Sequence, residues 1–331
     1  MEMRFAVKAL LEMDVKGRLA DAKQVAAKTG KPTAAILADM FGCAVRYGAG
    51  PADYKLFELY SKTPLQRSTY ITRGINNSLV KKYNDLSQPP KIDIKTEFYQ
   101  YFAQYTGRRY LPAAGVTRET LAEFCTGKDR VLYKPADGCC GKGIEMIDLK
   151  AWPLEKLYLW LWEKKEGLLD EVVEQHSAMA ALYPDSVNTV RLVTLRKAGV
   201  TTPLFAFLRM GMGGKVVDNL NSAGIAAKLE LEDGSITLPA AGKDGRLYYS
   251  HPQTDTPIVG FTVPHWDQVL RIARGASEVV PEVGYVGWDI AVRENDVVLI
   301  EGNSYPGHDI LQLPAYTPEN IGMKSLIKHF M

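Results

Sequence analysis

Short apolar runs typical of β-strands follow one another through the second half of the chain, with one helical pattern, residues 266–280, between them. Parallel strands need long crossover connections, usually helices, so strands that follow one another closely predict antiparallel sheets. We therefore expect an α+β fold. The expected strands of this half are residues 168–173, 187–196, 204–211, 228–231, 235–238, 285–292 and 297–301.

The N-terminal part of the chain has a different, helical pattern. Residues 7–13 and 20–28 are rich in Ala, Leu, Lys and Val without the alternation of a strand, and Pro32 stands where a helix can begin. Two successive prolines within residues 87–91 end regular structure. We expect a helical N-terminal region, residues 1–90, and a second domain, residues 91–331.

Composition excludes several classes of function. The 331 residues hold 40 Lys and Arg against 38 Asp and Glu, a formal charge of +2, so a general nucleic-acid binder is not expected. No stretch approaches the ~20 apolar residues of a membrane span, and we see no signal-peptide core in residues 1–11. Four cysteines form no disulfide or zinc pattern, so we expect a cytoplasmic protein.

A glycine-rich loop joins two expected strands, residues 131–134 and 143–149. It reads Lys-Pro-Ala-Asp-Gly-Cys-Cys-Gly-Lys-Gly and has glycines at 138, 141 and 143. Glycines let backbone N–H groups approach phosphate oxygens, and Lys134 at the strand end could reach a phosphate. The loop lacks the ending of a P-loop, and a flexible hairpin connection is the alternative interpretation.

Two carboxylates face each other in the last expected hairpin. If its loop is three residues, 294–296, Asp289 lies directly opposite Glu301, and Asn303 points to the same face. Opposed carboxylates repel each other, and a divalent cation removes that repulsion. Two carboxylates and an amide oxygen suit Mg²⁺ or Mn²⁺. An exposed hairpin with solvated acids is the alternative.

These features stand in an order that resembles the ATP-grasp superfamily, and more closely its sugar-transfer-associated family, which is related to α-L-glutamate ligases. The resemblance covers about residues 50–310. It rests on the joint order of short phrases, which are Tyr133-Lys-Pro135, Glu174-Gln-His176, Ser186-Val-Asn-Thr-Val-Arg191, Leu208-Arg-Met-Gly211, Val217-Asp-Asn219, Gly224-Ile225, His251-Pro252, Gly287-Trp-Asp289 and Glu301-Gly-Asn303.

The resemblance implies an ATP-grasp fold whose two α+β lobes, residues 91–172 and 173–331, enclose ATP and two Mg²⁺ ions. It implies that Arg191 and Arg209 face the transferred phosphate or the substrate. The implied metal ligands are Asp289, Glu301 and Asn303. The implied ATP-binding residues are Lys95, Lys134, the loop glycines Gly138, Gly141 and Gly143, and the interlobe hinge Glu171, Val172, Val173 and Glu174.

The resemblance implies a carboxylate–amine ligase that forms an amide through an acyl phosphate. Its partners would be small molecules, namely a carboxylate and an amine such as a sugar acid, an amino sugar, an amino acid or a peptide. Two alternatives stay open: a phosphotransferase on the same fold, and a nucleotide-binding regulator without turnover. Three histidines, His176, His251 and His308, are open as further substrate or proton-handling residues, while Trp152, Trp160 and Trp162 are expected to pack in a helix.

Overall fold

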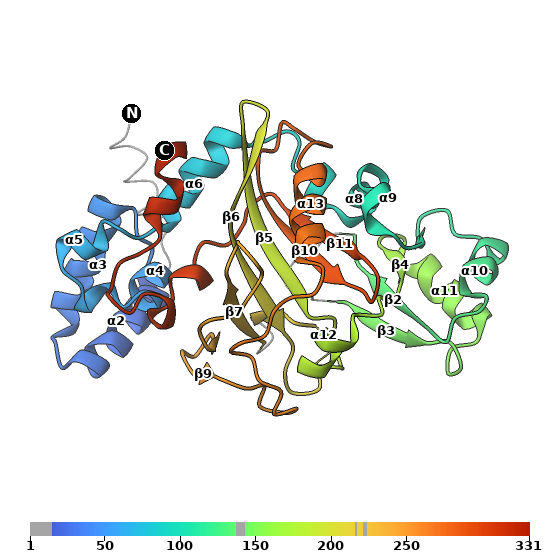
Figure 1. Ribbon diagram of the computed structural model, residues 1–331, viewed down its shortest axis with the longest axis horizontal. Coiled ribbons are helices and arrows are strands. Elements are labelled where there is room, and N and C mark those ends of the chain that lie inside the picture. Colours follow the sequence, from blue (N-terminus) through green and yellow to red (C-terminus); the bar gives the residue numbers. More distant parts are fainter. Residues whose placement is uncertain (1–14, 137–142, 216, 221–223) are drawn as a thin grey trace. The chain divides into compact units, whose positions relative to one another are not determined.

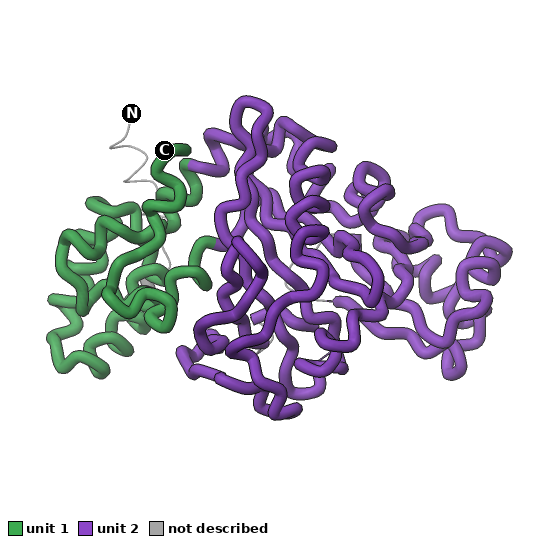
Figure 2. Tube along the Cα trace, viewed as in Figure 1, with its two compact units in different colours: residues 1–78, 308–331 green, residues 79–307 purple. Residues whose placement is uncertain are grey.

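The computed structural model describes residues 15–136, 143–215, 217–220 and 224–331. The chain divides into two compact units (Figure 2). One consists of residues 1–78 together with 308–331, and the other of residues 79–307. The last 24 residues, 308 to 331, thus group with the helical N-terminal part, whereas the expected boundary at residue 90 assigned them to the second domain.

The first unit is helical, as its composition predicts. Its longest helices pack apolar residues from one face; Ile36, Met40 and Cys43 on α3 are spaced four and three residues apart. α3 ends at Gly48, whose φ of 65° suits glycine. The elements of this unit are α2 (Val15–Thr29), α3 (Thr33–Tyr47), α4 (Pro51–Leu56), η1 (Leu59–Ser61), α5 (Pro64–Arg67), η3 (Ile310–Gln312), η4 (Pro314–Tyr316) and η5 (Lys324–Phe330); α6 (Arg73–Tyr83) continues into the second unit.

The second unit contains two antiparallel sheets (Figure 1). The small sheet has the order β1-β4-β2-β3, and helices α10 and α11 pack on one of its faces around Val131, Leu157 and Leu161. Its elements are β1 (Tyr110–Pro112), α10 (Arg118–Cys125), β2 (Arg130–Lys134), β3 (Glu145–Asp148), α11 (Leu154–Lys164) and β4 (Leu168–Glu171), preceded by α7 (Pro90–Asp93), α8 (Lys95–Tyr101) and α9 (Ala103–Thr106).

The large sheet has seven antiparallel strands in the order β11-β10-β5-β6-β7-β8-β9. Helix α13 lies against one face, where Val269 and Ala273 join Val190, Leu208 and Trp288 in the main core. The opposite face carries the charged residues of the expected site. The elements are α12 (Ser177–Leu182), β5 (Thr189–Lys197), β6 (Val200–Met210), β7 (Ile225–Leu229), β8 (Ala240–Gly242), β9 (Leu247–Tyr248), α13 (Trp266–Ala276), β10 (Tyr285–Val292) and β11 (Val297–Asn303).

The antiparallel α+β architecture confirms the fold class, and the model corrects two details of the expected elements. The strand expected at residues 235–238 is reduced to a single bridge, Ser235 with Thr262. The turn between β10 and β11 has four residues, 293–296, instead of three, because Val292 pairs with Val297. A β-bulge between Asp289 and Ile290 then shifts the register by one residue, so Asp289 still lies opposite Glu301.

Candidate active site

Asp289 on β10 is the centre of a buried charge cluster on the face of the large sheet opposite α13. Arg191 on β5 binds both of its carboxylate oxygens through Nε and Nη2, and Nη2 of Arg209 on β6 lies 2.8 Å from Oδ2. Burial alone would raise the pKa of Asp289, but the two guanidinium groups hold that pKa well below its usual range. Since Asp289 has no solvent exposure, the exposed-hairpin alternative is wrong.

Arg191 and Arg209 are each fixed by hydrogen bonds from Nε and Nη2, and Nη1 of each has no acceptor among the described residues. Arg209 donates to Thr189 Oγ1 at 3.1 Å from Nε, and its Nη2 lies 3.3 Å from Asp218. Asp218 also accepts a 2.9 Å bond from the backbone of Thr189. Within the described residues, no group accepts a hydrogen bond from Nη1 of Arg191 or of Arg209. These Nη1 groups can donate to an anion, and each guanidinium is fixed before the anion binds.

The three expected metal ligands lie together at the edge of the same sheet. Glu301 hydrogen-bonds to Asp289, and both burial and the charge of Asp289 raise the pKa of the Glu301 carboxyl. Burial and the nearby charge of Asp289 both disfavour the ionised form of Glu301, and a bound cation would offset both effects. Nδ2 of Asn303 is buried without a hydrogen-bond partner among the described residues.

The donor set fits a hard divalent cation. Exchanging the two ends of the Asn303 amide would put its oxygen where Nδ2 is unpartnered, and a cation would satisfy that oxygen. Two carboxylates and one amide oxygen are ligands that Mg²⁺ accepts, with phosphate oxygens and water completing the shell. The described residues include no group of three or more His, Cys, Asp or Glu side chains with metal-binding geometry.

Lys134, the expected phosphate ligand, belongs to a second buried cluster at the end of β2. Its Nζ lies 2.6 Å from Oδ2 of Asp170 on β4, which also pairs with Arg108 and accepts a hydrogen bond from Tyr99. Burial lowers the pKa of Lys134, although Asp170 and the more distant Glu301 act in the opposite direction. Arg108, which pairs with Asp170, also donates to the carbonyl of Leu299, two residues before Glu301, so this cluster lies beside the strand that carries Glu301.

The remaining expected ATP-binding residues lie near these clusters. The backbone N–H of Lys95, which opens α8, donates to the carbonyl of Ala136 at 3.1 Å, next to the start of the glycine-rich loop. Gly143 ends that loop with a φ of 73°, while Gly138 and Gly141 lie outside the described residues.

The expected hinge, Glu171 to Glu174, connects β4 of the small sheet to α12 and β5 of the second lobe. Glu171 already binds Lys128 at 3.1 Å and the backbone N–H of Arg109 at 2.8 Å. Glu174 is exposed, and Val172 and Val173 are half-buried. The carboxylate of Glu174 is therefore more available to a ligand than that of Glu171.

Residue types alone did not single out Arg108, Tyr99, Asp170, Thr189 and Asp218 as site residues. One usable signal was Asp170, an acid directly after two leucines of an expected buried strand. The three histidines have partners outside these clusters. His176 makes an edge-to-face contact with His265, Nε2 of His251 donates to the carbonyl of Gly211 at 2.9 Å, and His308 binds Asp53.

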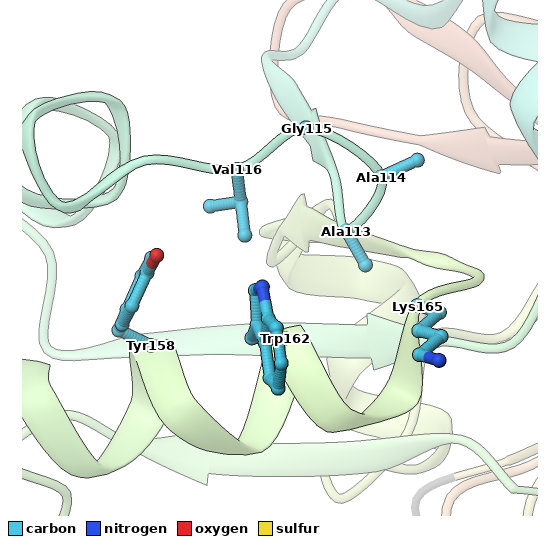
Figure 3. Close-up of a pocket in the computed structure, with 7 residues that line it drawn as sticks. All are labelled: Ala113, Ala114, Gly115, Val116, Tyr158, Trp162 and Lys165. Atoms are coloured by element: carbon cyan, nitrogen blue, oxygen red, sulfur yellow. The ribbon is translucent and has the colours of Figure 1, made fainter.

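A pocket of about 300 Å³ lies on the outer side of the small sheet (Figure 3), apart from both charge clusters. Tyr158 and Trp162 of α11 point toward the loop that follows β1, with Lys165 at one end. Trp152 and Trp160 pack against the core of the small sheet as expected, but Trp162 is 61% exposed. The expectation that Trp162 packs inside is wrong, because Leu157 and Leu161 already fill the inner face of the helix.

Comparisons with known proteins agree with this geometry. A family model described as sugar-transfer-associated ATP-grasp matches residues 154–322. No curated protein matches the sequence. Among described residues, no helix has both the length and the apolar character needed to cross a bilayer.

Three of the solved structures that are similar to this chain are described here. An ADP complex of purK, N5-carboxyaminoimidazole ribonucleotide synthetase, is 12% identical, with 66% of this chain and 46% of that chain covered and a TM-score of 0.42. D-Alanine-D-alanine ligase from Helicobacter pylori is 13% identical, with 71% of this chain and 61% of that chain covered and a TM-score of 0.41. ATP-grasp ligase PsnB with a minimal precursor is 14% identical, with 84% of this chain and 76% of that chain covered and a TM-score of 0.43. The chain thus spans less than two thirds of the first two proteins.

Proposed function

The chain belongs to the sugar-transfer-associated ATP-grasp family, and from this premise we propose that it is an ATP- and magnesium-dependent carboxylate–amine ligase. The observation that carries the proposal is the pair of buried charge clusters. Lys134 at the end of one sheet binds Asp170, and Arg108 joins Asp170 to the backbone of Leu299, two residues before Glu301 at the edge of the other sheet. A magnesium-bound triphosphate needs this arrangement, with cations near its phosphates and oxygen ligands for its metal.

In the proposed site, Lys134 donates to phosphate oxygens, and Lys95 is the second ATP lysine beside the glycine-rich loop. The backbone of Val172 and Val173 binds the adenine edge, and Glu174 binds its amino group or the ribose. Asp289, Glu301 and Asn303 hold the metal. When bound, Mg²⁺ neutralises the triphosphate charge, and the family suggests two such ions, with Mn²⁺ as a substitute.

The proposed reaction has two steps, in which the protein positions groups and neutralises charge. First, a carboxylate oxygen of the substrate attacks the γ-phosphorus of ATP, ADP leaves, and an acyl phosphate forms. The Nη1 groups of Arg191 and Arg209, which have no acceptor among the described residues, would donate to the charged oxygens of the transferred phosphate. Then an amine attacks the acyl carbon, phosphate leaves, the amine nitrogen loses a proton, and an amide remains.

The substrates we propose are small carboxylates and amines, such as a sugar acid, an amino sugar, an amino acid or a peptide. We place the protein in the cytoplasm, where ATP is supplied and where Cys43 and Cys125, both buried and unpaired, stay reduced.

The test is ADP release by the full chain with Mg²⁺, ATP and a panel of acids and amines. A ligase releases ADP only when both an acid and an amine are present. A stable phosphorylated product formed without an amine would instead indicate a phosphotransferase. Nucleotide binding without ADP in every mixture would indicate a regulator.

The same assay tests the metal assignment. Glu301→Gln removes one charged metal ligand but keeps the size and shape of the side chain, so we expect turnover to fall about 100-fold or more with unchanged folding. Glu163→Gln, an exposed acid on α11, is the matched control and should keep full activity. Turnover of Glu301→Gln equal to that of the control would remove Glu301 from the site.

A further inference from the structure

Arg108 connects the two sheets of the second unit. Its Nη1 donates to the carbonyl of Leu299 on β11 at 2.7 Å and to that of Thr106 at 2.9 Å. Its Nε lies 3.0 Å from both carboxylate oxygens of Asp170, and its Nη2 binds the hydroxyl of Tyr99. The guanidinium is almost fully buried, with 3% exposure. One side chain thus touches the small sheet, the large sheet and helix α8.

These bonds leave Arg108 little capacity for a ligand. A guanidinium has five N–H groups, and the described partners engage at least four of them. Lys134 is different. Its ammonium has three N–H groups, and its described partners are Asp170 at 2.6 Å and Tyr99 at 3.4 Å. Lys134 can therefore bind an anion, whereas Arg108 can only position other groups.

The charge of this cluster is unbalanced. Among the residues that the structure describes, Lys134 and Arg108 share one carboxylate, that of Asp170, so this part of the cluster has two positive charges and one negative charge. Leaving a buried charge without a partner is unfavourable, and an anion at Lys134 would restore the balance. The cluster is thus arranged to receive a negative group, such as a phosphate oxygen, from the side of Lys134.

The bond from Arg108 to Leu299 on β11 connects the cluster of Lys134, Asp170 and Arg108 to the strand that carries two candidate metal ligands, Glu301 and Asn303. Leu299 is two residues before Glu301, and the β-bulge of this hairpin lies in between. Gly107 adds to the contact, because its carbonyl accepts a 3.1 Å bond from Arg293. A Cβ at Gly107 would lie 2.7 Å from Cγ1 of Val298, so the backbone at Gly107 packs directly against the Val298 side chain on β11.

We propose that Arg108 is a positioning residue that fixes Lys134, through Asp170, at a set distance from Glu301, so that a triphosphate and its magnesium are bound together. The proposal rests on the proposed function. A phosphate chain that touches Lys134 and a metal held by Glu301 must span two different sheets. Any change in their spacing therefore weakens the joint binding of nucleotide and metal more than the binding of either alone.

The experiment measures the affinity of a non-hydrolysable ATP analogue by calorimetry, with and without excess magnesium, for the full chain. The measured quantity is the factor by which magnesium tightens binding. Arg108→Lys keeps the charge but cannot reach Asp170, Tyr99 and Leu299 at once. We expect this factor to fall about tenfold or more, with a smaller change in the affinity measured without magnesium.

Arg109→Lys is the matched control, because Arg109 is the next residue, is about half-exposed, and pairs only weakly through its side chain with Glu123 at 3.3 Å. In this control, magnesium should tighten nucleotide binding by the same factor as in the unmodified protein. A purely structural role for Arg108 would lower the melting temperature without a selective loss of this factor. An unchanged factor in Arg108→Lys would therefore overturn the inference.

A second variant covers the case in which Arg108→Lys does not fold. Tyr99→Phe removes only the hydroxyl that Arg108, Lys134 and Asp170 share, and it should also reduce the magnesium factor, by a smaller amount. An unchanged factor in Tyr99→Phe would then count against the inference. If the unmodified protein binds no nucleotide, the proposed function itself fails, which is distinguishable from a variant that binds normally.

Discussion

Two buried aspartates organise the charged residues of the second unit. Asp289 lies between Arg191 and Arg209, and Asp170 lies between Lys134 and Arg108. A buried ion pair adds little net stability, because desolvation offsets most of its attraction, but removing one partner leaves a costly unpaired charge. These aspartates therefore matter more for where they hold the cations than for the stability that they add.

The pKa of Asp170 predicts how the stability of the protein changes at acidic pH. Burial alone would raise the pKa of Asp170, but Lys134 and Arg108 hold that pKa below its usual range. An acid whose pKa is lower in the folded state stabilises the fold above its unfolded pKa of about 3.9, and this contribution is lost as the pH falls through the folded pKa.

We expect Asp170→Asn to lower the free energy of unfolding at pH 7 by about 3–5 kcal/mol, because two buried cations lose their partner. We also expect its stability to change less than that of the unmodified protein as the pH falls from 6 to 3, in urea titrations. Asp129→Asn, whose exposed partner is Lys150, is the control and should differ little. Equal stability of the two variants at pH 7 would contradict the buried cluster.

At the scale of elements, the connection between α11 and β4 determines where β2 ends. Gly167 in this connection has a φ of 93°, and a Cβ there would lie 2.5 Å from the carbonyl of Lys134 and 3.0 Å from the hydroxyl of Tyr133. The connection at Gly167 therefore packs directly against the end of β2, where the glycine-rich loop begins. Only glycine combines this φ with this close approach.

Replacing Gly167 with alanine should destabilise the protein through both strain and overlap. Gly127→Ala is the matched control, because Gly127 has a φ of 74° with no atom within 4 Å of the new Cβ. We expect about 1–2 kcal/mol for the control, and a further 1–3 kcal/mol for Gly167→Ala, measured by urea unfolding. If the two variants unfold at the same urea concentration, the close approach to Lys134 is not as described.

At the scale of the whole molecule, the C-terminal segment is part of the helical unit. Gln312, which has no solvent exposure, accepts from the backbone N–H of Ile71 at 2.7 Å and donates to the carbonyl of the same residue at 2.8 Å. It also donates to the carbonyl of His308 at 2.9 Å. A single amide thus closes a loop of 241 residues, and further contacts, Lys62 with Asn320 and Asp53 with His308, join the same two segments.

Gln312→Ala should loosen this unit selectively, since it leaves buried backbone groups of both segments without partners. Hydrogen exchange should become faster in peptides around Ile71 and in residues 308–323, while peptides from β5 and β6 keep their protection. Ser61→Ala, at an exposed residue of the same unit whose hydroxyl donates to the carbonyl of Glu58 at 2.8 Å, is the control and should affect only its own turn. Equally fast exchange in β5 and β6 would show that the two units unfold together.

The chemistry of the site was largely readable along the chain. Strand periodicity placed Arg191, Arg209 and Asp289 on regular strands, and the order of motifs indicated the family that the family model then matched. The opposition of Asp289 and Glu301 was predicted with a three-residue turn, and the structure reaches it with a four-residue turn and a bulge. The longer turn and the bulge offset each other, so the alternation of side chains still brings Asp289 opposite Glu301. Turn length alone therefore does not determine strand register.

The sequence by itself therefore determined the α+β class, the longer strands and the residue types of the candidate site, because periodicity and local motifs are properties of neighbouring residues. The short strands β1, β8 and β9 were not expected, and the strand expected at residues 235–238 is a single bridge. Only the tertiary structure decided which charges are paired. Arg108 meets Asp170 across 62 residues and Leu299 across 191, and Gln312 meets Ile71 across 241. Contacts of this kind depend on how distant segments pack in a desolvated interior, where each buried charge or amide must find a partner, and no local pattern specifies that partner.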